Sequence, residues 1–290
     1  MKPVASPYLV PFDDRFRIDD APRQPPGDEL DRDANEAKLG KSIKKIRKLQ
    51  KKLYADDRFA LLLVFQAMDA AGKDGTIKAV MTGINPAGCQ VYSFKQPSTE
   101  ERDHDFLWRI ARCLPERGRI GIFNRSHYEE VLVVRVHPEY LEGQSLPSIP
   151  SDLDELWSER YDSIRDFERH LARNGTVVLK FFLNVSRDEQ KRRFLDRIDE
   201  PESNWKFSKA DVEERSHWNA YMHAYEAALN ATSRPWAPWY AIPADDKPFM
   251  RRQVAKIVQK TLDKLDIDYP KVTAARRREL HAIGSELRDD

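Results

Sequence analysis

Cysteine and long apolar runs are both scarce in this sequence. The two cysteines, Cys89 and Cys113, lack metal-site spacing and are too few for a disulfide framework. We therefore expect both to be small core residues in a reducing compartment. No apolar stretch approaches the roughly 18 residues that a membrane span needs, and residues 1–16 contain no apolar signal-peptide core. These absences predict a cytoplasmic protein with no membrane partner.

An excess of charge of either sign is also lacking. The 290 residues include 49 lysines and arginines and 48 aspartates and glutamates, which gives a net charge of +1. A nucleic-acid-binding domain is normally strongly basic. We therefore expect no nucleic-acid partner, and any polyanion must meet a local patch. The length fits one large α/β domain with a full three-layer core or two small domains, and one domain is the simpler expectation.

The stretch from Leu61 to Val80 has the pattern of a strand, a loop and a helix. The apolar run 61–65 is continuous, as in a strand that helices cover on both faces. Small residues follow it, so that backbone N–H groups can turn toward a phosphate at the positive N-terminus of the helix. The predicted phosphate-binding residues here are Ala70, Ala71, Gly72, Lys73, Asp74, Gly75 and Lys78.

This loop departs from the usual G-x-x-x-x-G-K-[ST] pattern at two anchor positions. Ala67 replaces the first glycine, and Asp74 replaces the metal-binding serine or threonine. The match alone fits an ordinary strand-to-helix turn equally well. Asp69 is the distinctive residue, because a carboxylate in a phosphate loop repels the ligand unless Mg²⁺ lies between them or it orients an acceptor. We therefore predict a variant phosphoryl-transfer site with Asp69 as the metal ligand.

Polar residues follow two later predicted strands, at the edge where open α/β sheets bind ligands. Lys95 follows the second strand, and Asn124 and Arg125 follow the third. Arg125 can hold a phosphate bidentately, and Glu129 lies one turn further along. Asn124 stands where an acidic metal ligand is normally found. The predicted nucleotide-binding residues are Lys95, Asn124, Arg125 and Arg135.

Five apolar strands that alternate with helices predict a parallel sheet with right-handed crossovers. One helix is expected from the capping box at Ser98 to Gly118, and a long helix is expected to begin at Ser208. The arginine-rich segment 186–207 is typical of a lid over phosphates, although its acidic residues fit a solvated helix equally well. Its candidate phosphate ligands are Arg187, Arg192 and Arg193.

The remaining segments set the expected domain limits. Residues 1–28 are rich in proline and predict an extended surface arm, residues 29–270 form a single domain, and residues 271–290 form a charged tail. A helix over 29–55 carries many cations, which fit either a solvated face or a surface that binds a long polyanion with salt-sensitive affinity. These cations are Lys44, Lys45, Arg47, Lys48, Lys51 and Lys52.

Three stretches resemble the polyphosphate kinase 2 family, and the resemblance covers roughly residues 40 to 265. They are AMDAAGKDGTIK, SFKQPSTEERDHDFLWR and GIFNRSHYEEVLVVRVHPE. The resemblance implies a P-loop kinase-like fold, with a parallel sheet between helices and a helical lid. It is strongest to the subgroup, class III, that transfers phosphoryl groups reversibly from inorganic polyphosphate to both AMP and ADP, giving ADP and ATP. It also implies Mg²⁺ as cofactor and a homodimer or homotetramer.

The resemblance further implies that Asp69, Lys73, Arg125 and Glu129 are catalytic. Many members of the family have Asp-Arg where this chain has Asn124 and Arg125, and the family associates this change with AMP use. From the residues alone, two other functions stay open. An ATP-dependent nucleoside-monophosphate kinase is disfavoured by the missing serine or threonine after Lys73. A non-catalytic polyphosphate-binding module is disfavoured by the carboxylate of Asp69.

Overall fold

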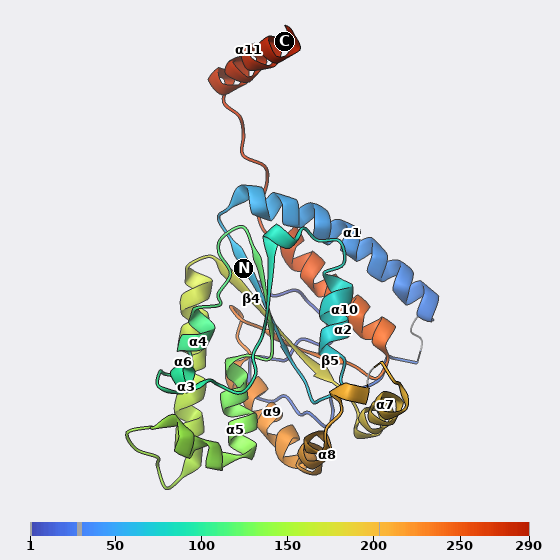
Figure 1. Cartoon of the computed structure of the whole chain (residues 1–290), viewed down its shortest axis with the longest axis vertical. Coiled ribbons are helices and arrows are strands. Elements are labelled where there is room, and N and C mark those ends of the chain that lie inside the picture. The colour runs from blue at the N-terminus through green and yellow to red at the C-terminus, as the bar shows by residue number, and fades with distance from the viewer. Residues whose placement is uncertain (1, 28–30, 203, 290) are drawn as a thin grey trace.

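A computed structural model of the chain describes residues 2–27, 31–202 and 204–289 (Figure 1). Five strands form one sheet in the order β2-β3-β1-β4-β5, and all neighbouring pairs are parallel. The strands are β1 Ala60–Gln66, β2 Cys89–Ser93, β3 Ile120–Asn124, β4 Thr176–Asn184 and β5 Trp239–Pro243. The parallel sheet predicted from the alternation of strands and helices is confirmed.

β1 lies at the centre of the sheet, between β3 and β4. All seven of its residues are buried, as the continuous apolar run predicts. The parallel register places Phe65 beside Asn124 and Gln66 beside Phe182. The carboxyl ends of three strands therefore meet at one edge, and the residues that follow these strands lie close together.

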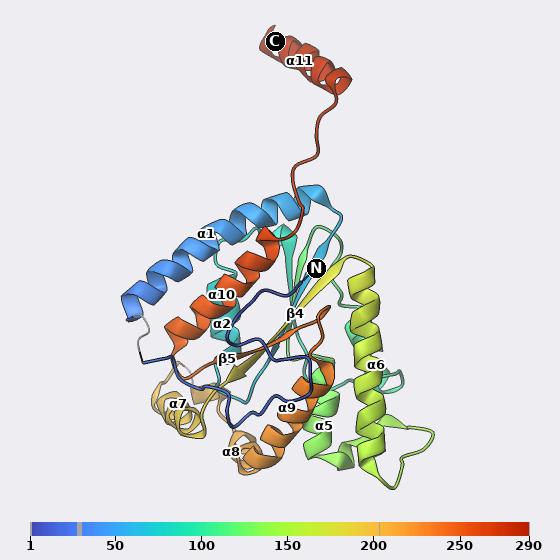
Figure 2. The same ribbon diagram turned by 180° about the vertical axis from the view of Figure 1, so that it is seen from behind.

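Helices cover both faces of the sheet (Figures 1 and 2). α1 and α10 run side by side on one face with α2, whereas α5, α6 and α9 lie on the other. The bounds are α1 Arg32–Asp56, α2 Lys73–Val80, α5 Val133–Val136, α6 Leu153–Arg173, α9 Trp218–Thr232 and α10 Lys247–Asp263. This is the three-layer arrangement expected of a P-loop kinase-like fold.

The prediction of one continuous helix between Ser98 and Gly118 is wrong. The structure has two short helices there, α3 Thr99–Arg102 and α4 Trp108–Ala111. The capping box at Ser98 forms as predicted. Between α3 and α4 the Asp105 carboxylate accepts a hydrogen bond from the Leu107 N–H at 2.9 Å, which forms a local turn in place of a continuous helix. Such side-chain bonds of aspartate compete with helical hydrogen bonding.

The lid lies between β4 and α9 in the chain. It contains α7 Arg187–Asp199, the 3₁₀ turn η4 Asn204–Lys206 and α8 Lys209–Ser216. The long helix predicted from Ser208 is wrong in extent, because the backbone leaves the helical conformation at His217, with φ −85° and ψ 16°. α9 begins directly afterwards. The lid helices are therefore joined to the sheet at the end of β4 and to α9 at this break.

The N-terminal arm lies along the open edge of β5. The Val10 N–H donates to the Trp239 carbonyl at 3.0 Å, and the Ala241 N–H donates to the Tyr8 carbonyl at 2.8 Å. Val4, Tyr8 and Val10 are buried. The arm thus covers a sheet edge that would otherwise expose unpaired backbone groups.

The last helix, α11 Ala274–Asp289, lies away from the rest of the molecule and has no buried residue (Figures 1 and 2). The other 3₁₀ turns are η1 Pro86–Gly88, η2 His127–Val131 and η3 Pro138–Gln144. Cys89 and Cys113 are free thiols and half-buried, so they are less enclosed than predicted. Among residues 2–27, 31–202 and 204–289, no helix combines the length and the apolar character that a membrane crossing requires.

Candidate active site

The loop between β1 and α2 begins at the carboxyl edge of the sheet. Ala70 and Gly72 both adopt left-handed backbone conformations, with φ of 59° and 102°. Gly72 is the N-cap of α2, and a Cβ atom there would lie 3.2 Å from the Met250 side chain. Glycine is therefore required at this position both by the positive φ and by the close approach of α10.

The Lys73 side chain folds back toward the residues that begin this loop. Its ammonium group donates to the Ala67 carbonyl at 2.8 Å and to the Met68 carbonyl at 3.5 Å. Burial lowers the pKa of Lys73, although Asp69 and Glu129 act in the opposite direction. The ammonium group thus places a positive charge beside the first residues of the loop.

Arg125 connects the predicted catalytic carboxylates. Its guanidinium lies 3.0 Å from Asp69 Oδ1 and 3.2 Å from Glu129 Oε2. Its φ of 62° is left-handed and unfavourable for arginine, yet its N–H continues the sheet by donating to the Phe65 carbonyl at 3.1 Å. Burial raises the pKa of Glu129, and the charges of Arg125 and Lys73 oppose that rise. The structure therefore brings Asp69, Lys73, Arg125 and Glu129 into one charged cluster.

Asn124 contacts the first turn of α2. Its side-chain amide donates to Asp74 Oδ1 at 2.6 Å and is 3.5 Å from Ser93 Oγ. A neutral residue at the end of β3 therefore satisfies one oxygen of the carboxylate that replaces the usual serine or threonine.

Arg193 and Gln190 bind the outer side of the phosphate loop from α7. The Arg193 guanidinium donates to the Ala70 and Ala71 carbonyls at 3.1 and 2.8 Å, and the Gln190 amide donates to the Asp69 carbonyl at 3.0 Å. Three successive loop carbonyls thus point toward α7. In a planar trans peptide the N–H points opposite to the C=O, so the N–H groups of Ala70 and Gly72 point away from α7.

Arg193 uses its remaining guanidinium N–H groups for hydrogen bonds within the protein. It donates to the Ala244 and Asp245 carbonyls at 2.6 and 3.0 Å and to Glu189 at 2.6 Å. Only 5% of the Arg193 surface is exposed. The structure therefore places this predicted phosphate ligand inside the protein, between the loop and the end of β5.

The remaining predicted phosphate ligands lie nearer the solvent. Arg192 is exposed on α7 and pairs with Glu189 and Asp196 at 2.6 and 2.7 Å. Arg187, at the start of α7, and Lys78, in the last turn of α2, are both exposed. Their roles in phosphate binding stay predictions.

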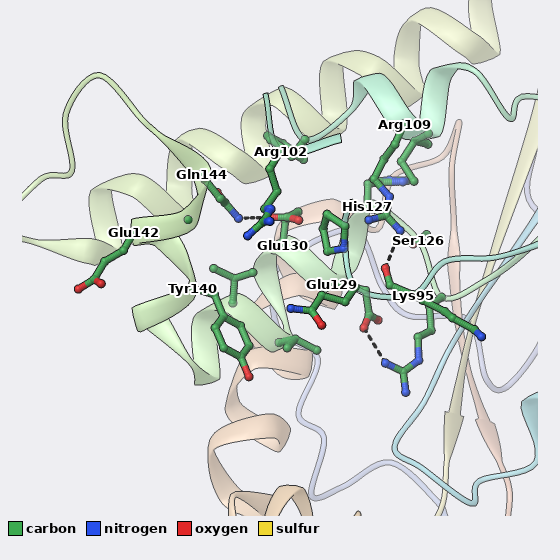
Figure 3. A pocket seen from close by; sticks show the side chains of 18 of the residues that line it. Lys95, Arg102, Arg109, Ser126, His127, Glu129, Glu130, Tyr140, Glu142 and Gln144 are labelled. Atoms are coloured by element: carbon green, nitrogen blue, oxygen red, sulfur yellow. Dashed lines mark hydrogen bonds and ion pairs between the residues drawn. The ribbon is translucent and has the colours of Figure 1, made fainter. Parts of the chain in front are cut away.

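A cavity of about 480 Å³ adjoins the charged cluster (Figure 3). Its volume is in the range of small-molecule sites. Its lining includes Lys95, Arg109, Arg125, Glu129, Tyr140 and Gln144. Lys95 lines this cavity together with Arg125, and Asn124 directly precedes Arg125 in the chain. Nucleotide binding by these residues stays a prediction.

Arg135 is not among the residues that line this cavity. Its guanidinium donates to the Tyr161 hydroxyl at 2.8 Å and to Asp154 at 3.1 Å, so it is engaged with α6. The nucleotide-binding role predicted for Arg135 stays a prediction.

Sequence reasoning missed several residues at the loop. A Cβ atom on Gly75 would lie 3.0 Å from the Arg251 guanidinium, which places this α10 side chain against α2. Burial lowers the pKa of Lys247, and the nearby charges of Arg193 and Arg251 lower it further. Lys247 was not missed, because its place in the loop that follows the fifth strand is a signal in the sequence for a residue that could face the substrate or cap the last helix. Gln190 carried none, because a glutamine in an arginine-rich helix has no distinguishing pattern.

The fit of a metal ion can be judged from the donor atoms. Within residues 2–27, 31–202 and 204–289 no group of three histidine, cysteine, aspartate or glutamate side chains could hold one. Asp69 and Asp74 supply carboxylates at the loop. Mg²⁺ is usually held by one or two carboxylates together with substrate phosphates. The donor set therefore fits a cation that arrives with a phosphate ligand.

Comparison with known proteins places these features in a family. The family described as Polyphosphate kinase 2 (PPK2) matches residues 29–270. The chain is 55% identical over 249 residues to the ADP-polyphosphate phosphotransferase of Rhodopseudomonas palustris, covering 86% of both proteins. It is 46% identical over 235 residues to the AMP/ADP-polyphosphate phosphotransferase of Meiothermus ruber, covering 81% of this chain and 84% of that protein.

The fold matches a solved structure as well. The crystal structure of polyphosphate kinase 2 from Arthrobacter aurescens superposes with a TM-score of 0.83 at 36% identity. The match covers 96% of this chain and 99% of that one. The similarity therefore extends over the sheet, the phosphate loop and the lid together.

Proposed function

The chain belongs to the polyphosphate kinase 2 family, and from that premise we propose that it transfers phosphoryl groups reversibly from inorganic polyphosphate to AMP and ADP. The products are ADP and ATP. The observation that carries this proposal is the convergence of Asp69, Lys73 and Arg125 at a phosphate loop beside an open cavity. Phosphoryl transfer depends mainly on positioning and on charge stabilisation, and this cluster supplies both.

The chemistry requires no general base. The acceptor is a nucleotide phosphate, whose second pKa is about 6, so its attacking oxygen is already ionised at neutral pH. This oxygen bonds to the terminal phosphorus of polyphosphate while the bond to the next bridging oxygen breaks. The negative charge then leaves on the shortened polyphosphate. Asp69 and Glu129 accordingly act on Arg125 by orienting it, and do not take a proton from the acceptor.

Two groups neutralise charge during the transfer. Arg125 lines the cavity and binds the acceptor phosphate, because a guanidinium suits two phosphate oxygens at once. Lys73 and the N–H groups of the loop bind the donor phosphates at the N-terminus of α2. Donor and acceptor thus meet between β1 and β3.

The reaction is expected to depend on a divalent metal, for which we propose Mg²⁺. Asp69 is the residue that would hold it, with Asp74 as a second carboxylate. When bound, the ion would neutralise negative charge on the phosphates that enter the site.

The range of acceptors is the finer part of the proposal, because one similar protein is named for ADP and another for AMP and ADP. The contact between Asn124 and Asp74 supports the broader range. An aspartate at position 124 would place a second negative charge next to Asp74. The neutral amide reduces the repulsion that the phosphate of AMP meets at this strand end.

Incubation of the purified protein with long-chain polyphosphate, Mg²⁺ and either AMP or ADP tests the proposal, with nucleotide chromatography as the readout and EDTA as the control. Formation of ADP and ATP from AMP supports both the donor and the acceptor range. Formation of ATP from ADP, with no product from AMP, would support polyphosphate as the donor and reject AMP as an acceptor. Turnover with ATP and AMP, but none with polyphosphate, would instead indicate a nucleoside-monophosphate kinase.

We also propose a homodimer or homotetramer in the cytoplasm, as expected for the family. Light scattering coupled to size-exclusion chromatography measures the assembly directly. A monomer across the working concentration range would reject this part of the proposal without affecting the proposed reaction.

A further inference from the structure

The positive charge of this chain is concentrated on α1. Residues 37–55 contain eight lysines and arginines and no acid, although the whole chain has a net charge of only +1. Like charges three and four residues apart on a helix destabilise it, as with Lys44 and Lys48. α1 therefore carries a charge pattern that works against its own stability.

Four of these cations form one stripe along the helix. They are Lys44, Arg47, Lys48 and Lys51, which we call the α1 stripe. Their spacing of i, i+3, i+4 and i+7 puts them on the same face. All four are exposed. In the part of the chain that the structure describes, no carboxylate lies within ion-pair distance of any of them.

The α1 stripe adjoins the end of the phosphate-loop helix. A Cβ atom on Gly83 would lie 3.3 Å from the Arg47 guanidinium, and Gly83 follows α2 by three residues. α2 begins at the loop lysine, Lys73, and its eight residues span about 12 Å at 1.5 Å per residue. Figure 1 shows α2 beside α10, with α1 across its far end. Lys78 lies exposed on α2 between the loop and the stripe.

We propose that the α1 stripe binds the polyphosphate chain beyond the phosphates that occupy the loop. This inference rests on the proposed function, because it assumes that polyphosphate is the donor. A donor of three phosphates fills the loop and cannot also reach the stripe, whereas a long chain can occupy both. The stripe thus favours long donors without taking part in the transfer itself.

Other polyanions and a membrane fit the stripe less well. Single-stranded nucleic acid is bound by several aromatic side chains interleaved with cations, whereas this face of α1 carries one aromatic residue, Tyr54, with the Arg119 guanidinium 6.0 Å from its ring. A membrane-bound helix inserts an apolar face, but the apolar side of α1, with Ile46 and Leu53, is buried. Lysine ammonium groups act as point charges, which suits a chain of phosphates without bases.

A pair of matched double variants tests the proposal in the full-length protein. Lys44→Gln with Lys51→Gln removes two charges from the stripe. Lys38→Gln with Lys45→Gln removes two exposed charges with the same spacing from another side of the same helix. KM and kcat are measured for each variant with long-chain polyphosphate and with tripolyphosphate, at several salt concentrations.

The stripe variant is expected to raise KM for long-chain polyphosphate by about 2- to 30-fold, the range for two exposed ion pairs. Its kcat, and its KM for tripolyphosphate, are expected to equal those of the wild type. The plot of log affinity against log salt is expected to lose about 1.4 units of slope, at roughly 0.7 per contact on a single-stranded polyanion. The Lys38 and Lys45 control is expected to show a clearly smaller change.

Three results would overturn the proposal. An equal rise in KM for long-chain polyphosphate in the two double variants would show that only the overall positive charge of α1 matters and that the stripe is not a binding site. An equal rise in KM for tripolyphosphate would place the effect at the loop, and an unchanged KM for long chains would remove the stripe from donor binding. If the wild type fails to use polyphosphate at all, the proposed function is wrong. Direct titration with fluorescent long-chain polyphosphate and with single-stranded DNA then decides whether the stripe binds either polyanion.

Discussion

Arg193 Nη1 lies 2.8 Å from the carbonyl oxygen of Ala71, so a lid arginine holds the backbone of the phosphate loop. The sequence predicts that Arg193 binds phosphate directly, as an exposed lid arginine would. Its burial and its bonds to loop carbonyls indicate a positioning role, in which Arg193 and Gln190 orient the loop so that N–H groups face the ligand. The two roles make different predictions.

We expect Gln190→Leu to lower kcat/KM for polyphosphate by about 5- to 30-fold, because one buried hydrogen bond contributes roughly 1–2 kcal/mol. No charge changes in this variant, but it also removes the hydrogen bond that Gln190 Oε1 accepts from Arg215 at 2.8 Å, so the loss of activity is assigned to the loop by the exchange of the loop amides. Arg193→Lys keeps the charge but not the fork that reaches both Ala70 and Ala71, and should cost about 3 kcal/mol of unfolding free energy.

Amide hydrogen exchange of residues 69–72 separates loop orientation from general damage. Faster exchange in this loop, with unchanged exchange in the sheet and unchanged affinity for AMP, is the expected pattern. Lys209→Gln, which removes a charge from a lid side chain that is 92% exposed, serves as the control. Normal loop exchange together with lost turnover would favour direct phosphate contact by Arg193.

Lys73→Ala is expected to reduce turnover by about 10²- to 10³-fold, equivalent to ~3–4 kcal/mol of transition-state stabilisation. The ammonium group also bonds to the Ala67 carbonyl, so Lys73→Gln is the matched variant that keeps a donor and removes the charge. If Lys73→Gln turns over at the wild-type rate, the charge of Lys73 has no catalytic role.

Asn124→Asp is expected to lower activity with AMP more than activity with ADP and to lower the stability of the protein. The reason is that two carboxylates would replace the 2.6 Å hydrogen bond between Asn124 and Asp74. The double variant Asn124→Asp with Asp74→Asn restores one carboxylate and one amide. Recovery of stability in this double variant, measured by urea unfolding, would confirm that the contact itself matters. Additive losses would contradict it.

His127 predicts a pH dependence of stability. It is buried, and burial lowers its pKa below the ordinary 6.5, so below pH 6.5 the unfolded chain binds more protons than the folded one. Stability therefore falls as pH drops from 6.5 toward the folded pKa, with a slope of at most about 1.4 kcal/mol per pH unit. His127→Gln should make the free energy of unfolding depend less on pH in this range. Urea unfolding at about pH 7, 6 and 5 measures this dependence. An unchanged slope would assign the dependence to other groups.

Local sequence patterns predicted the elements that build the site. The apolar run of β1, the small-residue loop and the helix that starts at Lys73 all lie where the pattern places them. The reason is that strand burial, positive-φ glycines and helix starts depend on neighbouring residues. The meeting of Asp69 with Arg125 was also within reach, because parallel strands end at one edge.

Helix continuity was less predictable. The interruption at Asp105 depends on a competing side-chain bond, and the break at His217 separates the lid from α9. Residues 99–105 contain no apolar residue, and residues 208–217 contain only Ala210 and Val212, so hydrophobic periodicity carries little information about helix continuity at either place.

The orientation of polar side chains inside the fold was decided only by the tertiary structure. Lys180 stands within an apolar strand and is buried beside Glu168 at 2.5 Å, and Arg193 turns inward while Arg192 next to it turns outward. Burial of a charge is tolerated only where partners from other elements satisfy it. The sequence by itself thus determined the loop, the strands and the family. Packing decided which of its many cations hold the protein together and which are left exposed to solvent.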